Sequence, residues 1–157
     1  MSKLTKFLMR IPVPWIFVSG YLIGVPFQLL FQLKFKSPVI VKIYLVAGII
    51  MFLFAVIIAS WCLLIFRKAH NTTTPGIRSA RLITNGPYRI SRNPMYISLI
   101  FAYIGEAAIL NQLCPLIVLP AVIYYVNNII IPVEEELLAG EFDGEYQNYQ
   151  RQVPKWL

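Results

Sequence analysis

The chain has 157 residues, of which 58% are hydrophobic and only 13% are charged. A soluble domain of this length has too small an interior to bury so much apolar surface, so the composition excludes an ordinary soluble protein and indicates a membrane protein. The net charge of +7 comes from basic residues that flank apolar segments, which is typical of membrane topology and of contact with anionic lipid, and nucleic-acid binding is not expected.

Four apolar segments along the chain are suited to cross a membrane. A helix needs about 20 mostly apolar residues to cross the hydrocarbon core. The first segment contains Pro26, at which we expect a kink, and the second has no charged residue. The last apolar stretch, residues 94–133, is too long for one crossing, so we expect it to turn near Asn111–Pro115. The sequence therefore predicts an all-α polytopic membrane protein with about four transmembrane helices, at residues 12–33, 43–66, 94–111 and 115–133.

The basic residues predict which side of the membrane each loop faces. Three of them lie between the first two spans, whereas eleven lie in the N-terminal segment, in residues 67–93 and in the C-terminal tail. Because positive charge gathers on the inner side, we expect both termini and residues 67–93 on the cytoplasmic side of an inner or cytoplasmic membrane. A cleavable signal peptide is not expected, because the N-terminal segment contains Pro12 and Pro14 and lacks a small-residue cleavage site.

The C-terminal tail, residues 134–157, differs from the rest of the chain in its charge. Six of the seven acidic residues lie between Glu134 and Glu145, directly after the last expected span. Apolar and aromatic residues recur in the tail at roughly helical spacing. They are Leu137, Leu138, Phe142, Tyr146 and Tyr149. We therefore expect a cytoplasmic amphipathic helix that lies back on the membrane face.

A polar motif, Gly86–Tyr96 with the sequence GPYRISRNPMY, separates two apolar segments. Asn93 and Pro94 are typical of a helix start, because Asn can cap free backbone N–H groups and Pro suits the first helical position. The N-terminus of a helix attracts anions, and Arg89 and Arg92 add full positive charges beside it. The motif therefore either marks a cytoplasmic membrane boundary or binds an anionic group.

Three adjacent carboxylates, Glu134, Glu135 and Glu136, follow the last span at the membrane depth of this motif. At the C-terminal end of a helix they oppose the macrodipole, so local helix energetics do not explain them. They either pair with Arg89 or Arg92 as a structural salt bridge or form, with those arginines, a site for a zwitterionic ligand. Nearby aromatic side chains suit a cationic group. These are Tyr88, Tyr96, Tyr146 and Tyr149.

Glu106 lies within the third expected span, where a charged side chain is costly unless it faces a partner or a wet cavity. Its rise along the helix from Tyr96 is about 15 Å, so we expect it outside the floor of the same site. A helix-packing hydrogen bond and a substrate contact are both open. Cys62 and Cys114 lie in apolar segments without metal-ligand spacing, so no metal is expected, and common hydrolase, protease and nucleotide-binding motifs are absent.

The two polar segments together resemble a known superfamily. The segment LITNGPYRISRNPMY, followed farther along by EEELLAGEFDGEYQNYQRQVPKW, resembles the integral-membrane methyltransferases of the isoprenylcysteine carboxyl methyltransferase and phospholipid methyltransferase superfamily. The resemblance is strongest to small bacterial members and covers residues 80–156. It implies S-adenosylmethionine as the methyl donor, with S-adenosylhomocysteine as its product, and a lipophilic acceptor that enters from the bilayer.

The chemistry of methyl transfer suggests roles for the charged residues. Arg92 is expected to orient the donor or the acceptor, and Glu135, Glu106 or a tyrosine to help an amine or thiol acceptor lose its proton. Glu106 is also the expected substrate contact. The resemblance implies further site residues. An upstream strip that begins at Ala80 is implied to contact the cofactor together with the two motifs. The cofactor-binding residues implied are Leu82, Ile83, Tyr88, Asn93, Pro94, Met95, Tyr96 and Glu134.

Three positions depart from the pattern of the prenylcysteine enzymes. Asn93 stands where those enzymes usually have His, and Asp143 stands where they have Gly. Ile130 occupies the position, four residues before Glu134, at which they have an arginine that faces the substrate carboxylate. The acceptor is therefore open between a prenylcysteine carboxylate, a phospholipid amine and a small thiol.

Two other classes of function are compatible with the sequence. In a non-catalytic membrane scaffold, the arginines and glutamates would only lock the helices together. A transporter is disfavoured by four short spans that contain one intramembrane charge. Methyl transfer from a sulfonium is an in-line displacement that depends on positioning and desolvation, so a methyltransferase needs no nucleophilic triad.

Overall fold

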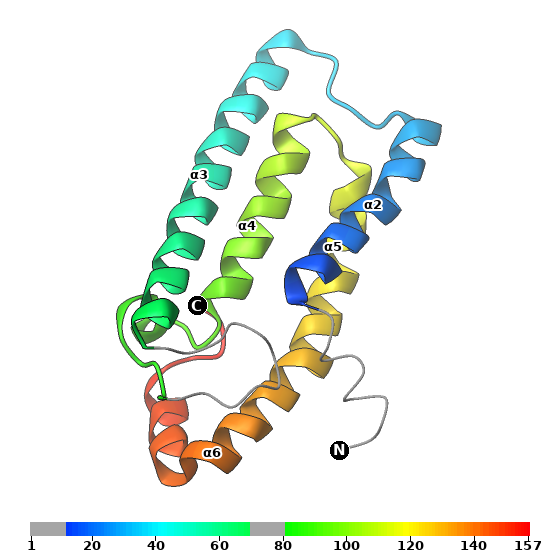
Figure 1. Cartoon of the computed structure of the whole chain (residues 1–157). Coiled ribbons are helices and arrows are strands. Elements are labelled where there is room, and N and C mark those ends of the chain that lie inside the picture. Colours follow the sequence, from blue (N-terminus) through cyan, green and yellow to red (C-terminus); the bar gives the residue numbers. More distant parts are fainter. Residues whose placement is uncertain (1–11, 70–80) are drawn as a thin grey trace.

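The computed structural model describes residues 12–69 and 81–157, and within these ranges the chain forms helices and no strands. Four apolar helices form a bundle, and a further helix extends from one end of it (Figure 1). The elements are α2 (Val13–Phe31), α3 (Pro38–Lys68), η1 (Gly86–Arg89), α4 (Pro94–Ile109), α5 (Cys114–Tyr125), η2 (Val126–Ile130) and α6 (Ile131–Gln152).

The prediction of an all-α membrane protein with about four apolar helices is confirmed. α2, α3 and the continuous helix Cys114–Gln152 are long and apolar enough to cross a membrane, and α4 is a shorter apolar helix. α2 continues as one helix on both sides of Pro26. The basic N-terminal segment and Ala80, the start of the implied cofactor strip, lie outside the described residues.

Small residues let the helices approach closely. A Cβ atom on Gly48 of α3 would lie 2.8 Å from the Cβ of Ala108 and 2.8 Å from the carbonyl oxygen of Gly105, both in α4. A Cβ atom on Gly24 of α2 would lie 2.5 Å from the Cα of Pro115 in α5. Because lipid is as apolar as the helix surfaces, such close van der Waals packing is what holds helices together in a membrane.

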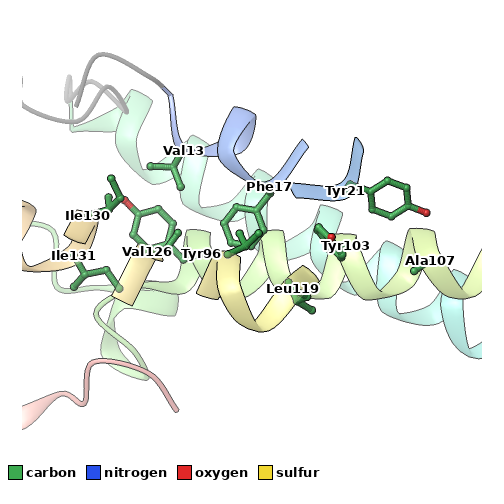
Figure 2. Packing of buried hydrophobic residues seen from close by; sticks show 11 residues of the cluster. Val13, Phe17, Tyr21, Tyr96, Tyr103, Ala107, Leu119, Val126, Ile130 and Ile131 are labelled. Carbon is green, nitrogen blue, oxygen red and sulfur yellow. The ribbon is translucent and has the colours of Figure 1, made fainter. Parts of the chain in front are cut away.

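The main core lies between α2, α4 and α5, and Figure 2 shows its side chains interdigitating. Phe17, Tyr103 and Leu119 are buried there, one from each helix. The outer faces remain apolar and exposed, as Trp15 at 62% exposure illustrates. This is the inverse of a soluble protein's surface and fits a bundle that lipid surrounds.

Side-chain hydrogen bonds tie the two loops at the far end of the bundle. Asn111 accepts from the backbone N–H of Phe35 at 3.1 Å and donates to the carbonyl oxygen of Phe35 at 2.9 Å. Gln28 donates to the carbonyl oxygen of Leu33 at 2.9 Å and accepts from the N–H of Cys114 at 3.0 Å. The α2–α3 and α4–α5 connections therefore hold the four helix ends in one arrangement.

The last apolar helix does not end before the acidic tail. Through η2 it continues into α6, and the N–H of Ile131 bonds to the carbonyl oxygen of Val126, five residues earlier. Pro132 has no N–H and its ring crowds the carbonyl of residue 128, which explains why the helix widens at this turn. The three glutamates therefore lie inside a helix of 39 residues. The expectation that they sit at a helix C-terminal end is wrong.

α6 breaks at Asp143, whose φ of 36° and ψ of −118° are not helical. The final turns then fold back toward the base of α3 and α4 (Figure 1). Tyr146, Tyr149 and Val153 are buried there, and Leu82 packs against them. The expected amphipathic tail helix thus buries its apolar residues against the protein itself.

We predict that Asp143→Gly raises the free energy of unfolding by about 1 kcal/mol, because glycine adopts a positive φ without the steric penalty of a Cβ atom. Thermal unfolding in detergent measures the change. Asp143→Ala is the matched variant, since it removes the same carboxylate and keeps the Cβ, and it should give no gain. Equal stabilisation by both variants would attribute the effect to charge and contradict this explanation.

Candidate functional site

Polar side chains from three distant parts of the sequence meet where α4 begins. They come from the motif 86–96, from the start of α6 and from the C-terminal segment that passes beside both (Figure 1). The structure therefore brings together the two segments that the sequence singled out. The residues next to each contact in the sequence explain why it forms.

Gly86 fixes the entry into this region. Its φ of 60° favours glycine, and a Cβ atom on it would lie 2.6 Å from Cδ1 of Ile65 in α3, so a larger residue would strain the backbone and displace the Ile65 side chain. Tyr88 is buried as a result, with its ring 5.8 Å from that of Phe66. Burial raises the pKa of the Tyr88 hydroxyl and keeps it neutral. The carbonyl oxygen of Tyr88 accepts a hydrogen bond of 2.7 Å from the hydroxyl of Tyr149.

Asn93 is the N-cap residue of α4, and Pro94 is its first residue. The expectation that the Asn93 side chain caps the helix is wrong, because it makes no cap hydrogen bond. It donates instead to the carbonyl oxygen of Lys155 at 2.9 Å. The backbone N–H of Asn93 donates to the hydroxyl oxygen of Ser91 at 3.1 Å. The polar groups of this turn therefore face the C-terminal segment.

The hydroxyl of Tyr96 lies 2.7 Å from both carboxylate oxygens of Glu134. Glu134 follows the apolar part of its helix, which ends at Val133. Burial raises the pKa of the Glu134 carboxyl to about 7, the negative charge of Glu135 acts in the same direction, and the hydrogen bond from Tyr96 opposes both. An enclosed carboxylate with one neutral donor is electrostatically suited to a cationic ligand.

Arg92 and Glu135 form an ion pair, with Nη1 and Oε1 3.0 Å apart. Their side chains are 13% and 21% exposed. Three of the shielded atoms, Nε and Nη1 of Arg92 and Oε1 of Glu135, have no well-directed hydrogen bond within the described ranges. The attraction between the two groups is therefore mainly ionic, and Nε of Arg92 is a donor without a well-directed partner.

Tyr146 lies next to this pair and is 1% exposed. Burial raises the pKa of its hydroxyl to about 12, Glu135 adds to the rise, and Arg92 opposes it. The hydroxyl stays neutral at physiological pH. The site therefore combines two carboxylates, one guanidinium and several neutral tyrosines.

The remaining expected site residues have the following surroundings. Leu82 packs against the cluster of Tyr146, Tyr149 and Val153, and Ile83 and Met95 are half-buried. Glu106 is exposed near the opposite end of α4, where it interacts electrostatically with Tyr21 and Tyr103. The arrangement therefore does not bring Glu106 to Arg92, Glu134 or Glu135.

Sequence reasoning missed the part played by the last residues of the chain. The N–H of Arg92 donates to the carbonyl oxygen of Pro154 at 3.0 Å, and the indole N–H of Trp156 donates to the side-chain oxygen of Asn127 at 2.9 Å. Two sequence features could have indicated this part: the Pro154 and Trp156 of the tail motif, and Pro132, which interrupts the regular hydrogen bonding of the helix beside Asn127.

The groups at this site can bind a small zwitterion that also carries a cationic centre. The guanidinium of Arg92 suits a carboxylate, and Glu134 suits a positive group. The described residues contain no group of three His, Cys, Asp or Glu side chains that could hold a metal ion.

A family match covers the turn before α4 and the start of α6. Residues 43–145 match the phospholipid methyltransferase family. The cobalt-zinc-cadmium resistance protein CzcN of Cupriavidus metallidurans is 28% identical over 97 residues, which are 62% of this chain and 41% of CzcN. The chain thus spans less than half the length of this curated relative. No solved structure matches the sequence significantly.

We predict that Arg92→Met lowers the free energy of unfolding by about 3 kcal/mol, because it leaves the Glu135 charge shielded and unpaired. Adding Glu135→Gln should restore part of the loss, with a coupling of about 1–2 kcal/mol in a double-mutant cycle measured by thermal unfolding. Arg89→Met is the control, since Arg89 is exposed, and should change stability by less than about 0.5 kcal/mol. Strictly additive effects of the two substitutions would show that the pair is not an energetic unit.

Proposed function

Because the chain belongs to the phospholipid methyltransferase family, we propose that it transfers a methyl group from S-adenosylmethionine to a lipophilic acceptor at the cytoplasmic membrane face. The family lies within the isoprenylcysteine carboxyl methyltransferase-like superfamily. Its family and its apolar helices support a membrane methyltransferase. The donor, the acceptor, the site residues and the orientation with both termini in the cytoplasm are parts of this proposal.

The observation that carries the proposal is the meeting of Tyr96–Glu134 with Arg92–Glu135. S-adenosylmethionine has a carboxylate, an ammonium and a sulfonium. The shielded donors of Arg92 that lack a hydrogen bond fit the carboxylate, and the enclosed Glu134 carboxylate fits the positive groups. Tyr88 and Tyr96, both buried, add aromatic surface that suits a cation. The residues present therefore fit this cofactor.

The bound cofactor supplies an activated methyl group whose leaving sulfur departs without further activation. The protein then needs mainly to position the two reactants and to exclude water. Arg92 and Glu134 are proposed to orient the donor, with Asn93, Pro94 and Met95 forming the adjacent turn. Glu135 Oε1, which has an unused acceptor position, is proposed to take the proton that an amine or thiol acceptor loses.

The acceptor we favour is a lipid amine or thiol rather than a prenylcysteine carboxylate. Ile130 stands where the prenylcysteine enzymes have a substrate-facing arginine, and it is 3% exposed within the main core. No positive charge at that position offsets a carboxylate substrate, which would be costly to desolvate unpaired. The match to the phospholipid methyltransferase family favours the amine. Glu106, at the other end of α4, is not assigned a catalytic part.

Calorimetric titration of the purified protein with S-adenosylhomocysteine tests the proposal. Wild type should bind, and Glu134→Gln should bind at least about tenfold more weakly, because it loses a charge-assisted contact. Glu136→Gln is the matched control, since Glu136 is the exposed neighbour, and its affinity should equal that of wild type. Absence of binding by well-folded wild type would refute the proposed function.

A thermal-shift measurement separates this proposal from a non-catalytic scaffold. At a cofactor-product concentration 100 times its Kd, the folded state should gain about 2.7 kcal/mol by mass action. A scaffold whose charges only lock helices together should show no such gain. The scaffold hypothesis also predicts that Glu134→Gln alters stability alone.

A further inference from the structure

The helix defect at η2 leaves one backbone carbonyl without a helical donor. In a regular α-helix, the carbonyl oxygen of Asn127 would accept from the N–H of Ile131, which here bonds to Val126. The next available donor, at the spacing of the wider turn, would be residue 132, and Pro132 has no N–H. The sequence therefore creates an acceptor at Asn127 that some other part of the chain must satisfy.

The C-terminal segment Val153–Leu157, which we call the strap, supplies the donors. The Nζ of Lys155 lies 3.4 Å from the carbonyl oxygen of Asn127 and 3.4 Å from its side-chain oxygen. The indole N–H of Trp156 donates to the same side-chain oxygen at 2.9 Å. Trp156 also packs against the main core. Asn127 thus accepts hydrogen bonds from the strap with both its backbone carbonyl oxygen and its side-chain oxygen.

The other side of the strap holds the turn before α4. The carbonyl oxygen of Pro154 accepts from the N–H of Arg92 at 3.0 Å. The carbonyl oxygen of Lys155 accepts from the side chain of Asn93 at 2.9 Å and from the hydroxyl of Ser91 at 3.2 Å. Three consecutive residues of the motif are therefore bound to two consecutive carbonyls of the strap.

These contacts close a ring around Arg92. Its backbone is bound to the strap, its guanidinium is paired with Glu135, and the strap is bound to Asn127. Asn127 and Glu135 belong to one continuous helix, about 12 Å apart along its axis. We infer that Asn127 is a positioning residue, which, through the strap, fixes Arg92 opposite Glu135 in the geometry that binds the donor. The binding part of this inference rests on the proposed function.

Three substitutions and a control test the inference. Asn127→Leu keeps the size of the side chain and removes its acceptor, and Trp156→Phe removes the indole donor. Asn127→Asp retains an acceptor for both strap residues and should rescue. Trp15→Phe is the control, since Trp15 is exposed on α2 and far along the chain from the strap. Each variant is titrated with S-adenosylhomocysteine and analysed by amide hydrogen exchange.

We expect Trp156→Phe, which loses one hydrogen bond, to weaken binding roughly tenfold, and Asn127→Leu, which loses the acceptor for both Lys155 and Trp156, to weaken it by at least as much. Asn127→Asp and Trp15→Phe should stay within about twofold of wild type, which is below the effect of one such bond. Without ligand, Asn127→Leu should speed exchange in peptides that cover residues 89–97 and 153–157, and leave α3 unchanged. A merely structural part for Asn127 predicts faster exchange in all helices instead, and would overturn the inference, as would unchanged exchange in both segments.

The exchange measurement separates this inference from the proposed function. If wild type binds no S-adenosylhomocysteine, the proposed function fails, and local exchange still decides whether the strap holds the motif. If wild type binds and Asn127→Leu binds equally well, the function stands and the positioning inference is refuted.

Discussion

The rest of the site depends on the ion pair between Arg92 and Glu135. A guanidinium and a carboxylate that are mostly withdrawn from water require each other, because either one alone carries a large desolvation cost. The pair joins the turn before α4 to the start of α6. Together with the hydrogen bond between Tyr96 and Glu134 and the contacts of the C-terminal strap, it fixes the relative position of these two segments. Its spare hydrogen-bonding atoms make it a feature of binding as well as of folding.

Irregularities in the last long helix shape the site around this pair. Pro132 widens the turn ahead of the glutamates, and the extra residue in that turn rotates all that follows by about 100° relative to a regular helix. Asp143 breaks the helix and returns the tail toward the bundle. Without the first irregularity the glutamates would face elsewhere, and without the second Tyr146 would not reach Arg92. The regular helices form the bundle, and the two irregularities orient the glutamates and Tyr146 toward Arg92.

The all-α fold with about four apolar helices was predictable from sequence, because length and apolar composition identify membrane helices. The meeting of Arg92 with the glutamates was also expected as one of two alternatives, since both segments flank spans at the same membrane depth. The hydrogen bond of the Asn93 side chain was not predictable. An Asn before Pro94 can either cap the helix or donate to another segment, and only the tertiary contact with Lys155 decides between these two. The Asn127 acceptor follows from Pro132 only once the helix is known to continue past it. The distance of Glu106 from the site followed from the helix rise, but its exposure depends on which face of α4 is packed, which the sequence does not show.

Arg92 and Glu134 are proposed to form the donor site for methyl transfer in the membrane. Membranes that contain the chain, supplied with S-adenosylmethionine labelled in its methyl group, test it most directly when the extracted lipids are separated and counted. Wild type should put label into an amine- or thiol-bearing lipid fraction, and Glu134→Gln should put in at least about tenfold less when the donor concentration lies below the wild-type Kd. Equal labelling by wild type and Glu134→Gln, or no labelling by a wild-type protein that is folded in the membrane, would contradict it.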